Sequence, residues 1–408
     1  MSALSESIPT GWRPAADRWW PLARLTPALL LVAVGVEMAA LVALLPETLQ
    51  AWWRGRPPAD FLLLLNAARD LEPNGLYSPG LSLLLYPLTW LDAEAAYRVY
   101  VALGGLAVLS IAYLTQREVG SLEGRLAVAL GVVTLPQMHW ALRFGHLTPF
   151  LAAAALAGFL LARRRPYLAG LCFSVLVLKL QYAPVPALYL LWTRNFRCLA
   201  AFVAGGVALE TAGFVAAGFD EMGPYLRGLF DLGSDHRDNL VPIQQAWQYA
   251  WPGFLISAGL DPNPLVAFDL MVLSLAAVAL VWTRGDKSVG PAAAALGMLL
   301  VSPYSNFYDW GLLVVAGVLL LRARVPWKGF VPAVLVALYV GLMATQRATP
   351  WPIDVVGLDP EQISGTRGLY WITPLALAVV CLLALTGQRK TSGRAAADLP
   401  KRQEPWPA

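Results

Sequence analysis

The chain alternates between long hydrophobic stretches and shorter polar connections. The hydrophobic stretches fall near 27–45, 96–115, 124–137, 147–162, 167–178, 182–193, 198–218, 264–283, 290–302, 310–321, 329–345 and 369–386. A membrane-spanning helix needs about 20 mostly apolar residues, and fewer suffice where neighbouring helices shelter a broken helix. The pattern predicts an all-α polytopic membrane protein with about 12 transmembrane helices, within a range of roughly ten to thirteen because several stretches are short.

The composition supports a membrane protein. Hydrophobic residues make up 58% of the 408 residues and charged residues only 14%, whereas soluble domains carry about 25% charged residues. The three cysteines lie in or beside hydrophobic stretches without disulfide or metal spacing, so we interpret them as small hydrophobic residues. The polar first 26 residues lack the pattern of a cleavable signal peptide.

The positive charges predict an orientation. If the N-terminus is cytoplasmic and each stretch crosses once, the inside connections hold 20 of the 30 Lys and Arg residues. Positive charge concentrates on the cytoplasmic side of membrane proteins. We therefore expect both termini to be cytoplasmic, with an N-terminal segment over 1–26, a single transmembrane domain over 27–386 and a disordered polar tail over 387–408. The outside connections are then 46–95, 138–146, 179–181, 219–263, 303–309 and 346–368.

The first outside connection has hydrophobic patterns of its own. Over 60–71, one helical face collects Phe61, Leu64, Leu65 and Ala68. This spacing predicts an amphipathic helix on the membrane surface. Residues 81–91 are apolar but too few to span, so we expect a re-entrant or interfacial helix there.

Nine of the ionisable residues that lie apart from the basic connections fall on the outside half: Asp60, Arg69, Arg143, His146, Lys179, His236, Arg237, Asp238 and Asp309. Charge at membrane depth is costly, so each residue needs a partner or a function. Transport pathways tend to place such groups near the midplane and on both sides. The one-sided arrangement therefore favours an extracytoplasmic active site.

Asp60 and Lys179 are the leading candidates for chemistry. Asp60 is predicted to lie where the chain leaves the bilayer. Its carboxylate could act as a general base toward an acceptor hydroxyl, or it could be the N-cap of the following helix. These two roles are compatible. Lys179 ends a hydrophobic stretch, where it either snorkels to the interface or contacts a phosphate. Pro184 and Pro186 predict a broken helix that lines a polar cavity.

Other polar residues admit two interpretations each. Arg143 and His146 occupy a short connection and suit phosphate binding or an ordinary salt bridge. His236 and Arg237 lie in a long outside loop, which is either a solvated turn or a cover over a bound headgroup.

Residues 302–309 form a dense polar and aromatic segment between two hydrophobic stretches. Tyr304 and Tyr308 there suit stacking on a sugar or hydrogen bonding to it. Asp309 enters a hydrophobic stretch, which is costly unless it pairs with Arg143 or Lys179.

Together these motifs resemble glycosyltransferase family 87, integral-membrane enzymes of the GT-C superfamily. Four segments between about 60 and 310 carry the resemblance: Asp60-Phe61 to Asn74-Gly75-Leu76-Tyr77, Arg143-Phe144-Gly145-His146-Leu147-Thr148, Ala169-Gly170-Leu171 to Lys179-Leu180-Gln181 with Pro184, and Ser302-Pro303-Tyr304 to Tyr308-Asp309. Some members of the family have a histidine in the last segment, where this chain has Asn306 and Asp309.

The resemblance implies a GT-C-like fold and an inverting glycosyltransferase. Its donor would be a polyprenyl-phosphate sugar, mannose or arabinose-like, and its acceptor a lipid or glycan hydroxyl. Asp60 would be the general base, and Lys179 would hold the donor phosphate with Arg143 or His146. The residues expected to contact the sugar or the acceptor are Gln181, His236, Arg237, Tyr304, Tyr308 and Asp309.

No cofactor is expected, because basic side chains can neutralise the phosphate without a metal. A requirement for a divalent metal is nevertheless not excluded by the sequence. We expect the protein in the plasma membrane of a prokaryote, with no nucleic-acid partner. Two other classes also stay open. One is a transporter or flippase of a lipid-linked sugar, and the other is a structural membrane subunit, which the one-sided polar cluster disfavours.

Overall fold

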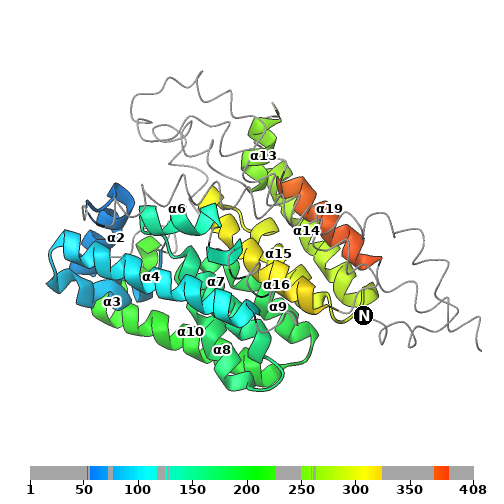
Figure 1. Cartoon of the computed structure of the whole chain (residues 1–408), viewed down its shortest axis with the longest axis horizontal. Coiled ribbons are helices and arrows are strands. Elements are labelled where there is room, and N and C mark those ends of the chain that lie inside the picture. The colour runs from blue at the N-terminus through cyan, green and yellow to red at the C-terminus, as the bar shows by residue number, and fades with distance from the viewer. Residues whose placement is uncertain are drawn as a thin grey trace, which may run out of the picture.

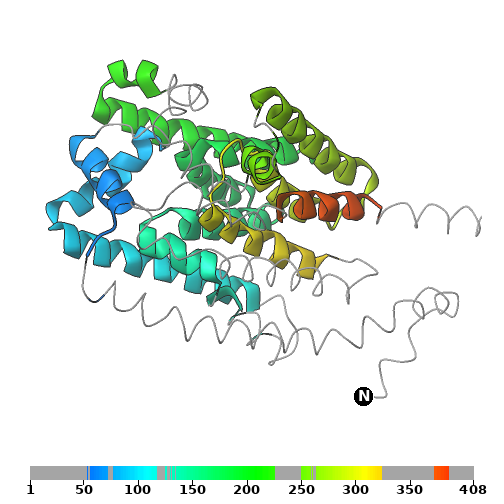
Figure 2. The same ribbon diagram turned by 90° about the horizontal axis from the view of Figure 1, so that it is seen from above.

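A computed structural model describes residues 53, 56–71, 77–116, 125, 129, 131–133, 135–225, 250–258, 260, 263–323 and 372–385. Within these ranges the regular elements are all helices and none is a strand, as the hydrophobic pattern predicts. Figures 1 and 2 show α4, α10, α14 and α19 as long or medium rods, with α2 and α3 gathered at one end of the molecule. The predicted spans 27–45 and 329–345 lie outside the described residues.

Three described helices are long and apolar enough to cross a membrane: α4 (Ala93–Gln116), α10 (Phe196–Ala217) and α14 (Pro264–Arg284). Each carries large apolar side chains on its outer surface, among them Leu106, Val207 and Leu273, which are 59%, 59% and 55% exposed. Such exposed apolar faces fit contact with lipid rather than water. The predicted number of about 12 spans stays a prediction, since the remaining described helices are shorter.

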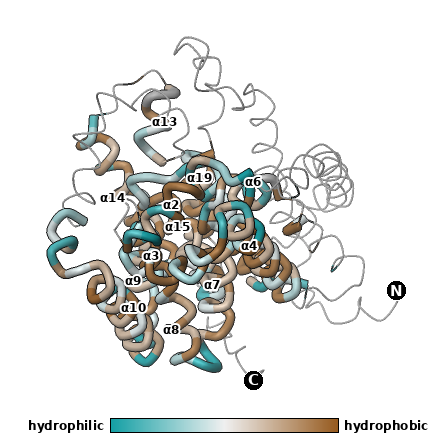
Figure 3. The backbone as a smooth tube through the Cα atoms, turned by 90° about the vertical axis from the view of Figure 1, so that its left-hand side faces the viewer, coloured by the Kyte–Doolittle hydropathy of each residue, from teal (hydrophilic) through white to brown (hydrophobic). Residues whose placement is uncertain are grey.

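The shorter helices pack between and beside these three. They are α7 (Thr148–Leu161), α8 (Pro166–Ser174), α9 (Pro184–Trp192), η4 (Phe219–Glu221), α13 (Trp251–Ser257), α15 (Gly290–Leu300), α16 (Leu313–Arg322) and α19 (Ile372–Ala384). In Figure 3 hydrophobic colour predominates along the packed helices, and hydrophilic colour gathers mainly at the turns.

Small residues let some of these helices approach closely. A Cβ added at Gly170 of α8 would lie 2.4 Å from the carbonyl oxygen of Cys198 in α10. Helix packing in lipid relies on such close backbone contact, because lipid leaves no hydrophobic driving force between helices. The α8–α10 pair is therefore a rigid support beneath the elements that follow α8.

The segment predicted as the first outside connection contains a helix with the predicted buried face, whereas its position relative to a membrane stays a prediction. Helix α2 (Ala59–Asp70) buries Phe61, Leu64, Leu65 and Ala68, the four residues that share the predicted hydrophobic face. Residues 79–90 form α3 (Pro79–Leu85) and η2 (Tyr86–Trp90), both too short to span a bilayer.

One predicted connection is instead a helix. Residues 138–146 were expected to link two spans, but α6 (Pro136–Phe144) occupies most of that range. Pro136 stands in its first turn, where its missing N–H costs nothing. A short helix therefore carries Arg143, and only Gly145, His146 and Leu147 connect it to α7.

The predicted broken helix is present, and the break falls at Lys179. Residues Val175–Tyr182 form the 3₁₀ segment η3, inside which Lys179 has non-helical angles of φ −135° and ψ 79°. Pro184 begins α9 and does not itself make the kink. The irregular backbone at membrane depth is sheltered by protein, since Lys179 and Tyr182 are buried.

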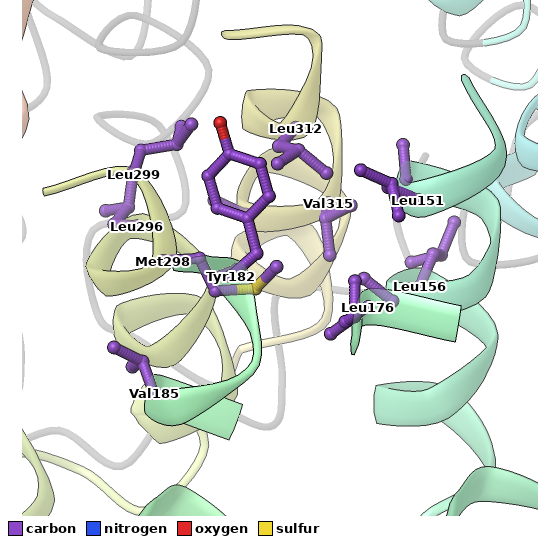
Figure 4. Packing of buried hydrophobic residues seen from close by; sticks show 14 of the residues in the cluster. Leu151, Leu156, Leu176, Tyr182, Val185, Leu296, Met298, Leu299, Leu312 and Val315 are labelled. Atoms are coloured by element: carbon purple, nitrogen blue, oxygen red, sulfur yellow. The ribbon is translucent and has the colours of Figure 1, made fainter. Parts of the chain in front are cut away.

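Tyr182 shows how the broken helix is enclosed. Figure 4 shows its ring between Leu296 and Leu299 of α15 on one side and Leu312 and Val315 on the other, with its hydroxyl pointing away from Val185. Leu312 ends η6 (Phe307–Leu312), which leads into α16. The end of the broken helix at Tyr182 and the end of η6 at Leu312 therefore pack in the same hydrophobic core.

Candidate active site

Asp60 lies in the first turn of α2, with its side chain 47% exposed. The N-cap of the helix is Pro58, and Asp60 makes no capping hydrogen bond, so the predicted N-cap role is wrong. The next residue, Phe61, is fully buried, with ring centroids 5.3 Å from Tyr97 and 5.2 Å from Tyr100. This aromatic anchor fixes the start of the helix and leaves the carboxylate accessible.

His146 lies beside Asp60. Its Nε2 is 3.2 Å from Asp60 Oδ2, although the approach is too oblique for a proper hydrogen bond. Its Nδ1 is 3.1 Å from the Tyr77 hydroxyl. The imidazole also stacks on Tyr308, with centroids 3.6 Å apart and planes at 16°. The side chains of Asp60, Tyr77 and Tyr308 therefore meet around the ring of His146.

Burial keeps the His146 ring neutral. Desolvation lowers the pKa of His146, and the positive charge of Lys179 lowers it further, whereas the carboxylates of Asp60 and Asp309 raise it. Burial also raises the pKa of Tyr77 well above its ordinary value, which keeps that hydroxyl protonated. Asp60 therefore faces a neutral imidazole rather than a cation.

The position of His146 follows from the way α6 ends. Gly145 adopts φ +78°, the left-handed conformation that glycine tolerates best. The backbone N–H of His146 donates to the Ala141 carbonyl at 2.7 Å, and that of Gly145 to Leu142 at 3.2 Å. These paired bonds form a Schellman motif, which turns the chain sharply at the helix end. His146 is thereby aimed at Asp60 by local geometry.

Lys179 and Asp309 form a buried ion pair. Lys179 Nζ lies 2.7 Å from both carboxylate oxygens, and the two side chains are 3% and 1% exposed. Asp309 also accepts from Thr148 Oγ1 at 3.2 Å and from the Asn306 N–H at 3.0 Å. Of the two partners expected for Asp309, the structure therefore selects Lys179, at the break in its helix.

Aromatic rings separate this ion pair from Asp60. Lys179 Nζ lies 6.0 Å from the centroid of Tyr77 and 5.7 Å from that of Tyr308. Both tyrosines also contact His146, which contacts Asp60. We name this layer of Tyr77, His146 and Tyr308 the aromatic layer. One layer of side chains therefore stands between the candidate base and the candidate phosphate-binding cation.

The segment before η6 closes the site on another side. Asn306 Nδ2 donates to the hydroxyls of Tyr304 and Tyr308. Gln181 Nε2 donates to the carbonyl of Tyr304, which ties the broken helix to this segment. The predicted residues Gln181, Tyr304, Tyr308 and Asp309 thus form one connected group.

Two buried hydroxyls lie beside this group, and the Tyr182 hydroxyl is close enough to Ser305, Gln181 and Asp309 to interact with each of them. Tyr182 Oη and Ser305 Oγ are both buried without a hydrogen bond of acceptable geometry. Native proteins rarely leave buried polar atoms unpaired, and a ligand is one way of satisfying them. They identify a polar surface next to Lys179 and Asp309.

Arg143 lies apart from the ion pair. Its guanidinium stands 5.1 Å from the Trp140 ring, and its carbonyl accepts a hydrogen bond from the Tyr97 hydroxyl at 2.9 Å. His236 and Arg237 lie outside the described residues. The structure therefore brings Asp60 together with His146, and Lys179 with Asp309, while the phosphate-binding role of Arg143 stays a prediction.

Several residues of this site had no signal of their own in the sequence. Tyr182 is a common residue type beside a hydrophobic stretch and nothing in its spacing marks it, whereas Thr148 and Ser305 were noticed only within longer segments. Tyr77 stood out only as part of a motif. A search for polar residues adjacent to the ionisable ones would have found them.

Comparison with known proteins gives one match. The model of glycosyltransferase family 87 matches residues 76–303, more than half of the chain. The matched range includes Tyr77, His146 and Lys179 and excludes Asp60 and Asp309. No curated protein and no solved structure matches the chain.

Proposed function

The chain belongs to glycosyltransferase family 87, and from this premise we propose that it transfers a sugar from a polyprenyl-phosphate donor to an acceptor hydroxyl. The sugar is mannose or arabinose-like, and the acceptor is a lipid or a glycan. We place the reaction at the extracytoplasmic face of a prokaryotic plasma membrane. The observation that carries the proposal is the half-exposed Asp60, one layer of side chains away from the buried Lys179–Asp309 pair.

Asp60 serves as the general base in this proposal. The acceptor oxygen attacks the anomeric carbon while Asp60 takes the hydroxyl proton, and the bond from that carbon to the phosphate oxygen breaks. The electron pair leaves with the polyprenyl phosphate, and configuration inverts because a single displacement has occurred. Asp60 then returns its proton to water, which its 47% exposure permits.

Lys179 supports the leaving group. Its ammonium is already neutralised by Asp309, so it attracts the singly charged donor phosphate only modestly. Its attraction grows as the leaving phosphate gains charge. An interaction that strengthens toward the transition state accelerates the reaction more than one that binds the ground state equally well. The Tyr182 and Ser305 hydroxyls, which make no hydrogen bond of good geometry within the protein, would donate to the phosphate or the sugar.

No cofactor enters this mechanism. The donor already carries a phosphate leaving group, and Lys179 is the cation that stabilises the charge growing on it. Transfer should therefore continue when divalent metals are removed by a chelator.

The test uses the full-length protein, purified in detergent. It is incubated with polyprenyl-phosphate mannose or polyprenyl-phosphate arabinose and candidate lipid and glycan acceptors, and the products are identified by mass spectrometry. Asp60→Asn should abolish transfer. The matched control is Asp70→Asn, at an exposed carboxylate in the last turn of the same helix, which should transfer normally. Full activity of Asp60→Asn would remove the base assignment.

A transporter or flippase of a lipid-linked sugar is the second candidate, because the same polar residues would suit binding of the headgroup. An enzyme makes product in detergent, without a bilayer, whereas a flippase moves an unchanged molecule between leaflets. Headgroup translocation in proteoliposomes, with no transfer product from any donor in detergent, would favour the flippase.

A further inference from the structure

The neighbours of His146 suggest a role other than phosphate binding. Its Nε2 faces Asp60 at 3.2 Å, its Nδ1 faces the Tyr77 hydroxyl at 3.1 Å, and its ring is stacked at 3.6 Å on Tyr308. Both nitrogens therefore lie within 3.2 Å of a polar atom of the protein. The two nitrogens of this buried imidazole therefore already have protein neighbours before a substrate binds.

These neighbours determine which nitrogen carries the proton. A carboxylate only accepts hydrogen bonds, so the nitrogen beside Asp60 must be the one that bears hydrogen. In a neutral imidazole the other nitrogen, Nδ1, is then an acceptor, and the Tyr77 hydroxyl donates a hydrogen bond to it. The Asp60 carboxylate thus selects the tautomer in which Nε2–H faces it, and the Tyr77 hydroxyl supports that tautomer by donating to Nδ1.

Resting on the proposed function, we infer that neutral His146 is a positioning residue for Asp60. The Nε2–H holds Oδ2 and leaves the other carboxylate oxygen to take the acceptor proton. The Tyr77 hydroxyl supports this tautomer by donating to Nδ1, and the stack on Tyr308 fixes the plane of the ring. The oblique approach to Asp60 tightens when the acceptor binds, as hydrogen bonds of a catalytic base often do.

Several charges act on this arrangement. Asp60 approaches from α2, Lys179 from the broken helix and Asp309 from η6, and all three influence the titration of His146. Protonation of Nδ1 would remove the acceptor for the Tyr77 hydroxyl and leave the ring a cation beside Asp60. A cation would hold the carboxylate too strongly for it to accept a proton from the acceptor. Transfer should therefore fall as His146 becomes protonated at low pH.

The kinetic test compares three variants with a matched control. His146→Phe keeps the ring stack and removes both nitrogens, so kcat should fall about 100-fold while the donor KM changes less than about threefold. His146→Gln places an amide N–H near the position of Nε2 and should recover activity to within about tenfold of the unaltered protein. Tyr77→Phe should lower kcat about tenfold.

The control is His139→Phe. His139 lies on α6, and its Nε2 bonds to the Val133 carbonyl at 2.8 Å rather than to any residue of the site. This variant should keep the kcat and the pH profile of the unaltered protein. The low-pH fall attributed to His146 should be absent from His146→Gln and present in His139→Phe.

A spectroscopic test needs no substrate. The chain has three histidines, so ¹⁵N-histidine NMR of the protein in detergent can be assigned with the His139 and His146 variants. His146 should show a protonated Nε2 and an unprotonated Nδ1 at neutral pH. The opposite tautomer, or an imidazolium, would overturn the inference whatever the enzyme's activity.

The outcomes separate this inference from the proposed function. A His146→Phe variant that retains kcat but raises the donor KM would overturn the positioning role and restore the phosphate-binding one. If His146→Phe does not fold, the pH profile of His146→Gln and the NMR spectrum decide the question. Absence of product from the unaltered protein with every donor would instead overturn the proposed function.

Discussion

Gly145→Ala provides a direct test of how the end of α6 positions the site. The added methyl group would lie 2.6 Å from Phe61 Cβ and 3.2 Å from Phe61 Cα. These are not flexible side-chain ends, and the Phe61 ring is held between Tyr97 and Tyr100. Relief of the overlap therefore requires α2 or the 145–147 connection to move by roughly an ångström, because interiors are close-packed.

The expected magnitude has two parts. An alanine in the left-handed conformation at φ +78° costs about 1–2 kcal/mol. Overpacking against Phe61 adds about 1–3 kcal/mol. The free energy of unfolding should therefore fall by about 2–5 kcal/mol. Because Asp60 adjoins Phe61 and His146 adjoins Gly145, the two side chains should separate, and kcat should fall about 100-fold for a displacement of about 1 Å.

The matched control is Gly105→Ala in α4. A Cβ there has no neighbouring heavy atom within 4 Å, and alanine is the better helix former by about 1 kcal/mol. Unfolding is followed by the fluorescence of the 16 tryptophans in mixed micelles of increasing SDS content, and transfer by product mass spectrometry. Equal stability of Gly145→Ala and Gly105→Ala would refute the steric reasoning. A destabilised Gly145→Ala variant with unchanged kcat would refute the coupling to Asp60.

Four further predictions concern the ion pair, a helix cap, metal and pH. Asp309→Asn should lose about 3–5 kcal/mol of stability, because it leaves Lys179 buried without its counter-charge. Adding Lys179→Met should recover part of this loss, and an equal or larger loss in the double variant would contradict the pairing. Asn195→Ala should cost about 1–2 kcal/mol, since Asn195 caps α10 and also donates to the Ala162 carbonyl. Asn263→Ala, which removes only the cap of α14, should cost less in the same unfolding assay. EDTA should leave transfer unchanged, and a loss that Mg²⁺ or Mn²⁺ restores would show a metal requirement. Burial lowers the pKa of His146, so the unfolded state binds the proton more readily, and stability should fall as pH drops below about 6.5. This fall should be smaller in His146→Phe, and an unchanged pH dependence would contradict the assignment.

Much of the fold follows from local pattern. The face formed by Phe61, Leu64, Leu65 and Ala68 predicts α2 and its buried side, because the 3.6-residue period is a property of the helix itself. The all-helical class follows from long apolar stretches, since lipid requires each backbone group to be satisfied within its own segment. The short helix α6 within the connection predicted over 138–146 was not anticipated, because its apolar pattern is too brief to indicate a helix.

The candidate site was predicted only in part. Ionisable residues in apolar surroundings are conspicuous, so Asp60, His146, Lys179 and Asp309 could be selected by their cost alone. Their pairing could not, because 86 residues of sequence separate Asp60 from His146, and 130 separate Lys179 from Asp309. The sequence offered two possible partners for Asp309, Arg143 and Lys179. In the structure Asp309 pairs with Lys179, which lies at the break in its helix.

The sequence by itself determined the helical class, the amphipathic start of the first outside connection and the ionisable residues that gather on one predicted side. Each of these depends on hydrophobic period or on the cost of charge in lipid, which are local properties. Only the tertiary structure decided that His146 faces Asp60 and that Lys179 is neutralised by Asp309. Those contacts depend on the left-handed turn at Gly145 and on the packing of the broken helix against η6, where ångström-scale geometry selects among chemically equivalent partners.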